Sequence, residues 1–291
     1  MAGERMKKIL KGLVVLIILT PLLLWGGVTV GAKLTVAKDA TWGQISGMVA
    51  QGLFGSVICA VKGCEAELLE GMESVVFDAE LLTSTPVAIE IDEAGRVLVA
   101  ETGRQDQGAE DNRNHDYWLM DDLASRTVGD RRAYYQKWID KGEIEDPDRF
   151  TSATDRVVVL EDTDGDGVAD SRVELASWNE MASGLVAGLE AREGAIYVTS
   201  VPSVYRILDA DADGVAESID TLHTGFGVKT SLIGHDLHGL VWGPDGKLYF
   251  SMGDRGYHVT LPSGEVLQPT LGPGRGAVFR MNSDGSALEV F

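Results

Sequence analysis

One loop is written twice in this chain, first as Asp155-Arg-Val-Val-Val-Leu-Glu-Asp-Thr-Asp-Gly-Asp-Gly-Val-Ala-Asp-Ser171 and then as Ser203-Val-Tyr-Arg-Ile-Leu-Asp-Ala-Asp-Ala-Asp-Gly-Val-Ala-Glu-Ser218. In each copy a short run rich in β-branched residues, which favour strands, leads into an Asp-x-Asp-x-Asp-Gly loop. Gly167 and Gly214, which end the two motifs, lie 47 residues apart. A repeat of this length is typical of a propeller blade or a similar unit.

Paired hairpins surround the two loops. Hairpins of alternating apolar residues with glycine turns recur along the chain, and each is followed by a second hairpin that carries the polar loop. Two hairpins make one four-stranded antiparallel sheet, which is the unit of a β-propeller. The sequence therefore predicts an all-β fold with about three blades, near residues 86–175, 184–222 and 239–291. The third blade carries a degenerate loop, Asn282-Ser-Asp-Gly285.

Three blades do not close a ring, and the chain stops inside a strand-like run. We therefore expect residues 86–291 to be a partial β-propeller, truncated at its C-terminus. Two insertions interrupt the blades. The first covers about residues 103–154, and its segment 116–141 is expected to be helical because apolar residues recur among the charges. The second, 254–275, is rich in Gly and Pro and is expected to be a loop.

The N-terminal residues predict export. Residues 12–32 carry no charge, and a helix of that length spans about 30 Å, enough for a bilayer core. The lysines before it place its start in the cytoplasm. Val30-Gly-Ala32 would also suit a signal peptidase, so residues 1–33 are either a cytoplasmic tip with an uncleaved anchor, which we favour, or a signal peptide. Residues 34–85 are expected to be a linker, with the body facing the periplasm or exterior of a bacterial cytoplasmic membrane.

The charge and the cysteine content of the chain argue against some classes of function. Residues 1–38 hold six basic residues and one acidic residue, so within a total of −20 the rest of the chain carries −25. Such an acidic body would repel phosphates, which argues against binding to nucleic acid and suits a domain that binds cations. Cys59 and Cys64 form either a local disulfide or a pair of buried thiols, and no haem-attachment run is present.

The two Asp-rich loops are candidate calcium sites. Carboxylates at loop positions 1, 3, 5 and 9 with Gly at position 6 resemble the first part of a calcium loop, although Val173 and Asp220 occupy the position of the bidentate Glu. The alternative is a polar hairpin turn that holds no ion. We favour Ca²⁺ more for the first loop than for the second, with a stiffening role. The candidate ligands are Asp162, Asp164, Asp166 and Asp170, and then Asp209, Asp211, Asp213 and Glu217.

Two histidines precede a predicted strand, where loops reach the mouth of a propeller. His235 could act as a general base, and His235-x-x-His238 could hold a transition metal. The alternative is that both side chains hydrogen-bond neighbouring loops. Asp254 and Arg255 follow the last strand of the same hairpin and either face the same mouth or bridge two blades.

Three stretches carry a resemblance to a known family. They are Val157-Val-Val-Leu-Glu-Asp-Thr-Asp-Gly-Asp-Gly167, Gly225-Phe-Gly227, and His235-Asp-Leu-His-Gly-Leu-Val-Trp-Gly-Pro-Asp-Gly-Lys-Leu-Tyr249 with Gly253-Asp-Arg-Gly256. From about Glu80 to Phe291 the chain resembles the PVC-type membrane-bound dehydrogenase domain, which is often fused to a c-type cytochrome. More distantly it resembles the quinone-dependent glucose/sorbosone dehydrogenases. The resemblance implies a six- or seven-bladed propeller outside the cytoplasmic membrane.

The resemblance also implies roles for site residues. In the sugar dehydrogenases a His eight residues before the Gly of Gly-Pro-Asp-Gly takes the hydroxyl proton while hydride passes to the quinone, and His235 stands at that position. It implies His235 as the base and Arg255 as the residue that orients substrate or cofactor, with His238 and Asp254 at the same mouth. In that family an Arg-Asn pair then contacts pyrroloquinoline quinone, whereas this chain has Tyr257-His258.

The expected function is that of an exported, membrane-anchored propeller domain of a sugar or alcohol dehydrogenase. It would be a quinone- or haem-linked oxidoreductase acting on CH–OH groups and passing electrons to a cytochrome. Haem c would come from a missing C-terminal domain or from a partner. The alternative is a non-catalytic, calcium-stiffened propeller that binds carbohydrate or a partner protein.

Overall fold

The computed structural model describes residues 75–291 apart from 79–81, 112, 114, 210, 233 and 271–274. The chain divides into two compact units, and every described residue lies in the second, Val75–Phe291. The predicted anchor, the linker up to residue 74 and both cysteines lie outside the described residues. Within the described part of the chain, no helix combines the length and the apolar character needed to cross a membrane.

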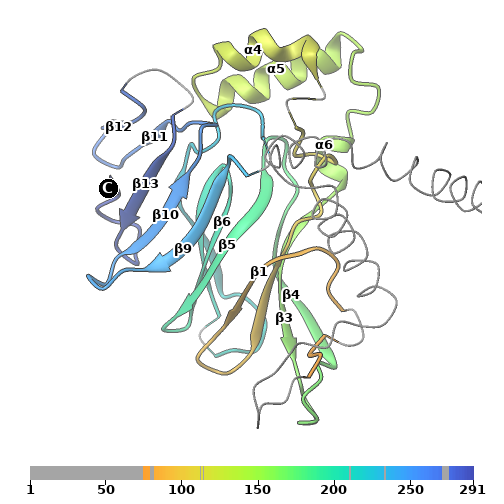
Figure 1. The fold of residues 1–291 in the computed structure, drawn as a ribbon, viewed down its shortest axis with the longest axis vertical. Helices are drawn as coiled ribbons and strands as arrows, with labels where there is room; N and C mark the ends of the chain where they lie inside the picture. The colour runs from red at the N-terminus through yellow and green to blue at the C-terminus, as the bar shows by residue number, and fades with distance from the viewer. Residues whose placement is uncertain are drawn as a thin grey trace, which may run out of the picture. The chain divides into compact units, whose positions relative to one another are not determined.

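Three four-stranded antiparallel sheets form the body, and they stand side by side like propeller blades (Figure 1). In each sheet the strands pair in chain order, and a separate small hairpin is inserted within the third. The first sheet contains β1 (Pro86–Ile91), β2 (Val97–Glu101), β3 (Asp155–Glu161) and β4 (Ser171–Trp178). The second contains β5 (Gly184–Arg192), β6 (Ala195–Val201), β7 (Ser203–Leu208) and β8 (Ser218–Thr224), and the third β9 (Leu237–Trp242), β10 (Leu248–Met252), β13 (Ala277–Met281) and β14 (Glu289–Val290).

Apolar residues between neighbouring sheets make the core, because the faces that two sheets turn toward each other are buried together. Leu98 and Val157 of the first sheet pack with Val198 of the second in one buried cluster. Tyr197, on the opposite face of β6, packs with Phe279 of the third sheet in another. The alternation of side chains along β6 thus joins all three sheets.

The described residues do not close into a ring. Ala88 of β1 packs against the second sheet, so Val87, Ile89 and Ile91 on its other face stay 48%, 66% and 62% exposed. On the third sheet, the face turned away from the core exposes Val241 and Val278. All-β architecture with four-stranded, propeller-like blades is therefore confirmed, while the number of blades in a complete ring stays a prediction.

The first insertion forms helices over one end of the sheets (Figure 1). It contains a short 3₁₀ helix, η2, at Asp116–Trp118 and three α-helices: α4 (Leu119–Ala124), α5 (Val128–Asp140) and α6 (Arg149–Ser152). Thr127 begins α5 with a capping box, accepting a hydrogen bond from the backbone N–H of Asp130 while its own N–H is bound by that side chain. Arg131 of α5 donates to the carbonyl of Lys229 (3.1 Å), and the Lys229 ammonium donates to the carbonyl of Asp122 (2.6 Å). These bonds fasten the helices to the connection between β8 and β9.

The second insertion differs from the expected loop. It contains a small hairpin of β11 (Val259–Thr260) and β12 (Val266–Leu267). A turn closes it through a hydrogen bond from the Gly264 N–H to the carbonyl of Leu261 (2.9 Å), with Gly264 at φ +87°. Val259 is fully buried in the core, and this tertiary contact explains why two residues extend despite the Gly- and Pro-rich surroundings.

Candidate functional site

His235 and Asp254 lie at the adjacent ends of two paired strands. Leu237 at the start of β9 pairs with Met252 at the end of β10, so the residues two positions further out meet. Gly253 lies so close to His235 that a Cβ atom would collide with the carbonyl oxygen of His235. The approach brings His235 Nδ1 to 2.9 Å from Asp254 Oδ1.

This pair has the geometry of an oriented base. An ionised carboxylate can only accept, so Nδ1 donates its hydrogen to Asp254, and in the neutral imidazole this leaves the lone pair on Nε2. The side chains of His235 and Asp254 are 48% and 45% exposed, so solvent or a substrate can reach them. Arg255 donates from Nε to the same Asp254 oxygen (3.1 Å) and is itself mostly buried, with 14% of its side chain exposed. Arg255 and His235 therefore contact the same oxygen of Asp254.

The charge of Asp254 is held in place by its neighbours. Partial burial would raise the pKa of Asp254, but the hydrogen bond and charge of Arg255, followed by those of His235, outweigh it and lower the pKa below its usual value. Asp254 thus stays ionised over the neutral range and can keep the imidazole oriented.

His238 does not share this arrangement. It lies within β9 opposite Ser251, and its Nε2 is buried without a hydrogen-bond partner among the described residues. The described residues contain two groups of three side chains that could hold a metal ion, and neither includes a histidine. A metal site at His235 and His238 stays a prediction.

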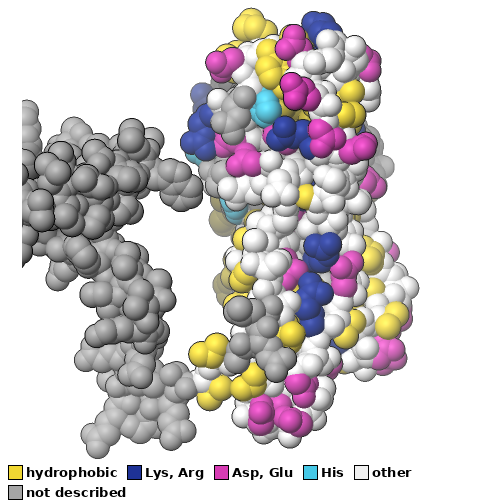
Figure 2. Space-filling model, turned by 90° about the vertical axis from the view of Figure 1, so that its right-hand side faces the viewer, with side chains coloured by type: hydrophobic (Ala, Val, Ile, Leu, Met, Phe, Trp, Pro, Cys, Tyr) yellow, Lys and Arg dark blue, Asp and Glu magenta, His cyan; other side chains and the backbone are white. Residues whose placement is uncertain are grey.

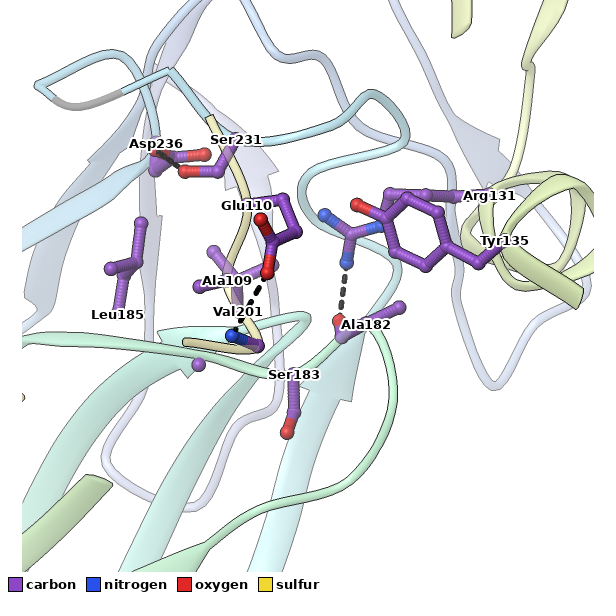
Figure 3. Close-up of a pocket in the computed structure, with 12 residues that line it drawn as sticks. Ala109, Glu110, Arg131, Tyr135, Ala182, Ser183, Leu185, Val201, Ser231 and Asp236 are labelled. Carbon is purple, nitrogen blue, oxygen red and sulfur yellow. Dashed lines mark hydrogen bonds between the residues drawn. The ribbon is translucent and has the colours of Figure 1, made fainter. Parts of the chain in front are cut away.

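A small polar cavity lies beside the start of β9 and under the helices (Figure 3). Asp236, only 1% exposed, accepts from Ser231 Oγ (2.6 Å) at Oδ2, while its Oδ1 has no partner among the described residues. Arg131 lines the same cavity, and its Nε likewise has no partner in this part of the chain. The cavity has room of ≈ 10 Å³, about one water molecule.

Burial raises the pKa of Asp236, although the hydrogen bond from Ser231 and then the charge of Arg131 oppose the rise. No motif in the sequence points to Asp236 or Arg131. Arg131 lies among charged residues of a helix with no clear apolar face, and only the tertiary fold turns it inward.

The first Asp-rich loop brings three of its four candidate ligands together. One oxygen each of Asp162, Asp164 and Asp166 lie within 4.8 Å of one another. Asp162 already accepts from the backbone N–H groups of Gly165 (2.7 Å), Asp166 (3.1 Å) and Gly167 (2.8 Å). These bonds, with that from Gly167 the largest, lower the pKa of Asp162. Asp170 instead accepts from the Thr163 hydroxyl (2.8 Å) and is not in the group.

The second Asp-rich loop brings a different set of carboxylates together. Oxygens of Asp209, Asp211 and Glu217 lie within 4.8 Å of one another, and Asp213 is not in this group. Asp220, at the last position of the motif, pairs with Arg206 (2.7 Å). Both groups offer only carboxylate oxygens, the ligands that Ca²⁺ prefers, so the residues present fit calcium.

The residues after Asp254 do not fit the quinone contact of the sugar dehydrogenases. Tyr257 is 6% exposed and packs edge-on against Phe279, with ring centroids 4.9 Å apart. The His258 N–H donates to the carbonyl of Gly225 (2.7 Å), and its ring Nδ1 is buried. Neither side chain takes the place of the Arg-Asn pair, so these two residues do not fit pyrroloquinoline quinone.

Residues 65–291 match the family described as a domain of unknown function (DUF7133). The chain belongs to this family. No curated protein matches the sequence.

Two solved structures show distant likenesses. A Thermus thermophilus protein assigned as an oxidoreductase (glucose dehydrogenase) has 17% sequence identity and a TM-score of 0.33, over 67% of this chain and 44% of that chain. A puromycin-hydrolysing peptidase of Mycobacterium tuberculosis has 11% identity and a TM-score of 0.33, over 71% of this chain and 28% of that chain. The chain spans less than half the length of either protein, and at these scores neither likeness carries an argument about function.

Proposed function

We propose that His235 is the general base of a dehydrogenase acting on CH–OH groups of a sugar or an alcohol. The observation that supports this most is the 2.9 Å hydrogen bond between His235 Nδ1 and Asp254 Oδ1 at a half-exposed site. His235 Nε2 takes the hydroxyl proton, Asp254 stabilises the imidazolium that forms, and Arg255 positions Asp254. A bound redox cofactor would supply the acceptor for the hydride from the same carbon, and a cytochrome would then take the electrons.

The proposal includes the setting of the reaction. The uncharged run 12–32 anchors the chain in the bacterial cytoplasmic membrane, and the acidic body works on the periplasmic side. The sequence supports this placement through the lysines that precede the run. His238, within β9, has no role in the proposed reaction.

Activity of a variant tests the proposal directly. The full chain, purified from membranes, is incubated with a panel of sugars and alcohols and an electron-accepting dye, and dye reduction is followed by absorbance. We expect His235→Gln to lower the rate by about 10²–10⁴-fold, the usual contribution of a general base. Asp284→Asn, an exposed carboxylate on the degenerate third loop, serves as the control and should keep the wild-type rate. Full activity in His235→Gln would exclude His235 as the base.

A second candidate function is a calcium-stiffened propeller that binds carbohydrate or a partner protein without catalysis. The convergence of carboxylate oxygens in both Asp-rich loops favours it. In that case the absorbance spectrum of the full chain would show no redox band that responds to sugars. Calcium would raise the melting temperature, since a ligand that binds only the folded state stabilises it.

A further inference from the structure

The two Asp-rich loops differ in what their first carboxylate contacts. In the first loop, both oxygens of Asp162 accept backbone N–H groups of the loop itself. In the second loop, Asp209 Oδ2 accepts from Arg96 Nη1 (2.7 Å), and Oδ1 accepts no hydrogen bond from any residue that the structure describes. At the same position of the motif, Asp162 therefore has hydrogen-bond donors for both oxygens without an ion, whereas Asp209 has a donor for only one.

Asp209 and Asp162 also differ in how deeply they are buried. Asp209 is 2% exposed, and its side chain is fully withdrawn from solvent, whereas Asp162 is only half-buried. A buried carboxylate oxygen without a donor is strongly unfavourable, and a coordinated cation would remove that cost. Asp209 also lines a cavity of ≈ 310 Å³ between the β1–β2 turn and the β5–β6 turn.

Arg96 connects the loop to the neighbouring sheet. It comes from the turn after β1 and bonds Asp92 of that turn (2.7 Å) as well as Asp209. Gly214, at the end of the second motif, also lies against Val173 of β4, where an added Cβ would be 3.3 Å from the valine side chain. The second loop thus contacts the first sheet at two places, and its order affects the junction between two blades.

We infer that the second loop, and not the first, is the tight divalent-cation site, with Asp209, Asp211 and Glu217 as ligands, and that the ion braces the junction between the first and second sheets through Arg96. This inference deepens the calcium part of the second candidate function by naming the loop and its structural effect. It is independent of the proposed catalysis at His235, which lies at the other end of the strands.

The test compares equivalent substitutions in the two loops of the full chain. Calcium chloride is titrated calorimetrically into wild type, Asp209→Asn and Asp162→Asn after chelator treatment. Each substitution replaces one carboxylate oxygen by an amide at the same position of the motif, so the pair is matched. We expect Asp209→Asn to weaken the tightest binding event at least 10-fold and Asp162→Asn to leave it unchanged.

Arg96→Met provides the second readout. It removes a positive charge beside the ligands but no ligand, so we expect calcium to bind more tightly while the calcium-free protein melts at a lower temperature. Loss of tight binding in Asp162→Asn but not in Asp209→Asn would overturn the inference and leave the calcium-stiffened propeller standing. Absence of calcium binding in the wild type would overturn both, while His235 activity would be unaffected.

Discussion

Asp155 shows how one buried carboxylate can join segments that are distant in sequence. Its Oδ1 accepts from the backbone N–H groups of Gly103 (2.9 Å) and Arg104 (3.1 Å), and its Oδ2 accepts from that of Val186 (3.1 Å). The side chain thus fixes the exit of β2, the start of β3 and the start of β5.

Removing the Asp155 carboxylate should strongly destabilise the fold. We expect Asp155→Ala to lower the free energy of unfolding by about 3–5 kcal/mol, because it leaves buried backbone donors unpaired. Chemical denaturation followed by tryptophan fluorescence measures the change. Asp140→Ala, on the exposed end of α5, is the control and should change stability by less than about 0.5 kcal/mol. An equal effect of both substitutions would contradict the role of Asp155.

The contribution of Asp236 to stability changes with pH in the opposite sense to that of a carboxylate in an ordinary ion pair. Its pKa in the fold lies above the ordinary value of 3.8, mainly because of burial. Its contribution to stability is therefore largest below that value and is lost as the pH rises through the raised pKa. Asp236→Asn, which can still accept from Ser231, avoids burying a charge.

We expect Asp236→Asn to stabilise the protein by about 1 kcal/mol or more at pH 7, and the gain to shrink as the pH falls toward 4. Thermal melts of wild type and variant across this pH range measure the difference. A gain that stays constant with pH would show that Asp236 does not titrate in the folded state.

At the level of elements, close approach between β5 and β9 limits what residues the sheets tolerate. A Cβ on Gly188 of β5 would lie 2.5 Å from the Thr199 hydroxyl and 2.9 Å from the backbone carbon of Gly239. The second and third sheets can therefore pack at this distance only with glycine there.

We expect Gly188→Ala to lower stability by about 1–3 kcal/mol, as overpacking of a core does. Gly129→Ala, on α5, is the matched control because its Cβ would meet only the Thr127 hydroxyl at 3.4 Å. It should be neutral or stabilising, since alanine favours a helix. Denaturation midpoints of the two variants measure the change in stability. An unchanged midpoint for Gly188→Ala would contradict the tight packing.

The elements also separate the two candidate functions in space. The strands are antiparallel, so the loops after β3 and β7 lie at one end of the sheets, and His235, before β9, lies at the other, near the helices (Figure 1). Figure 2 shows acidic side chains gathered at the lower end, where the β3–β4 loop lies in Figure 1. A cation in these loops would act on the stability of the sheets and would not touch a substrate at His235.

Much of this organisation could be predicted from the sequence, because hairpins and Asp-Gly turns are local. The four-stranded sheets follow the expected ranges closely, as the period of alternating apolar residues predicts. The contact of Arg96 with Asp209 could not be predicted, since 113 residues separate the two and neither belongs to a shared motif. The preference for the first calcium loop rested on spacing alone, and spacing does not show that Asp162 is satisfied by its own backbone.

At the scale of the whole molecule, the outermost faces of the described sheets carry exposed apolar residues. Ile89 and Ile91 on β1 are 66% and 62% exposed, which is unusual for residues that alternate on a strand beside a packed sheet. In a closed propeller each such face would be covered by the next blade. The exposed faces are those expected of a partial propeller, and the number of blades in a complete ring stays a prediction.

We propose that His235 and Asp254 act as one catalytic unit. The measurement that tests it most directly is the rate of sugar- or alcohol-dependent dye reduction by the full chain in His235→Gln, Asp254→Asn and the double variant. Because Asp254 works only through His235, we expect the double variant to be no slower than His235→Gln alone. If the rate losses of the two single variants multiply in the double variant, His235 and Asp254 do not act as one unit. Wild-type rates in all three variants would contradict the proposed function itself.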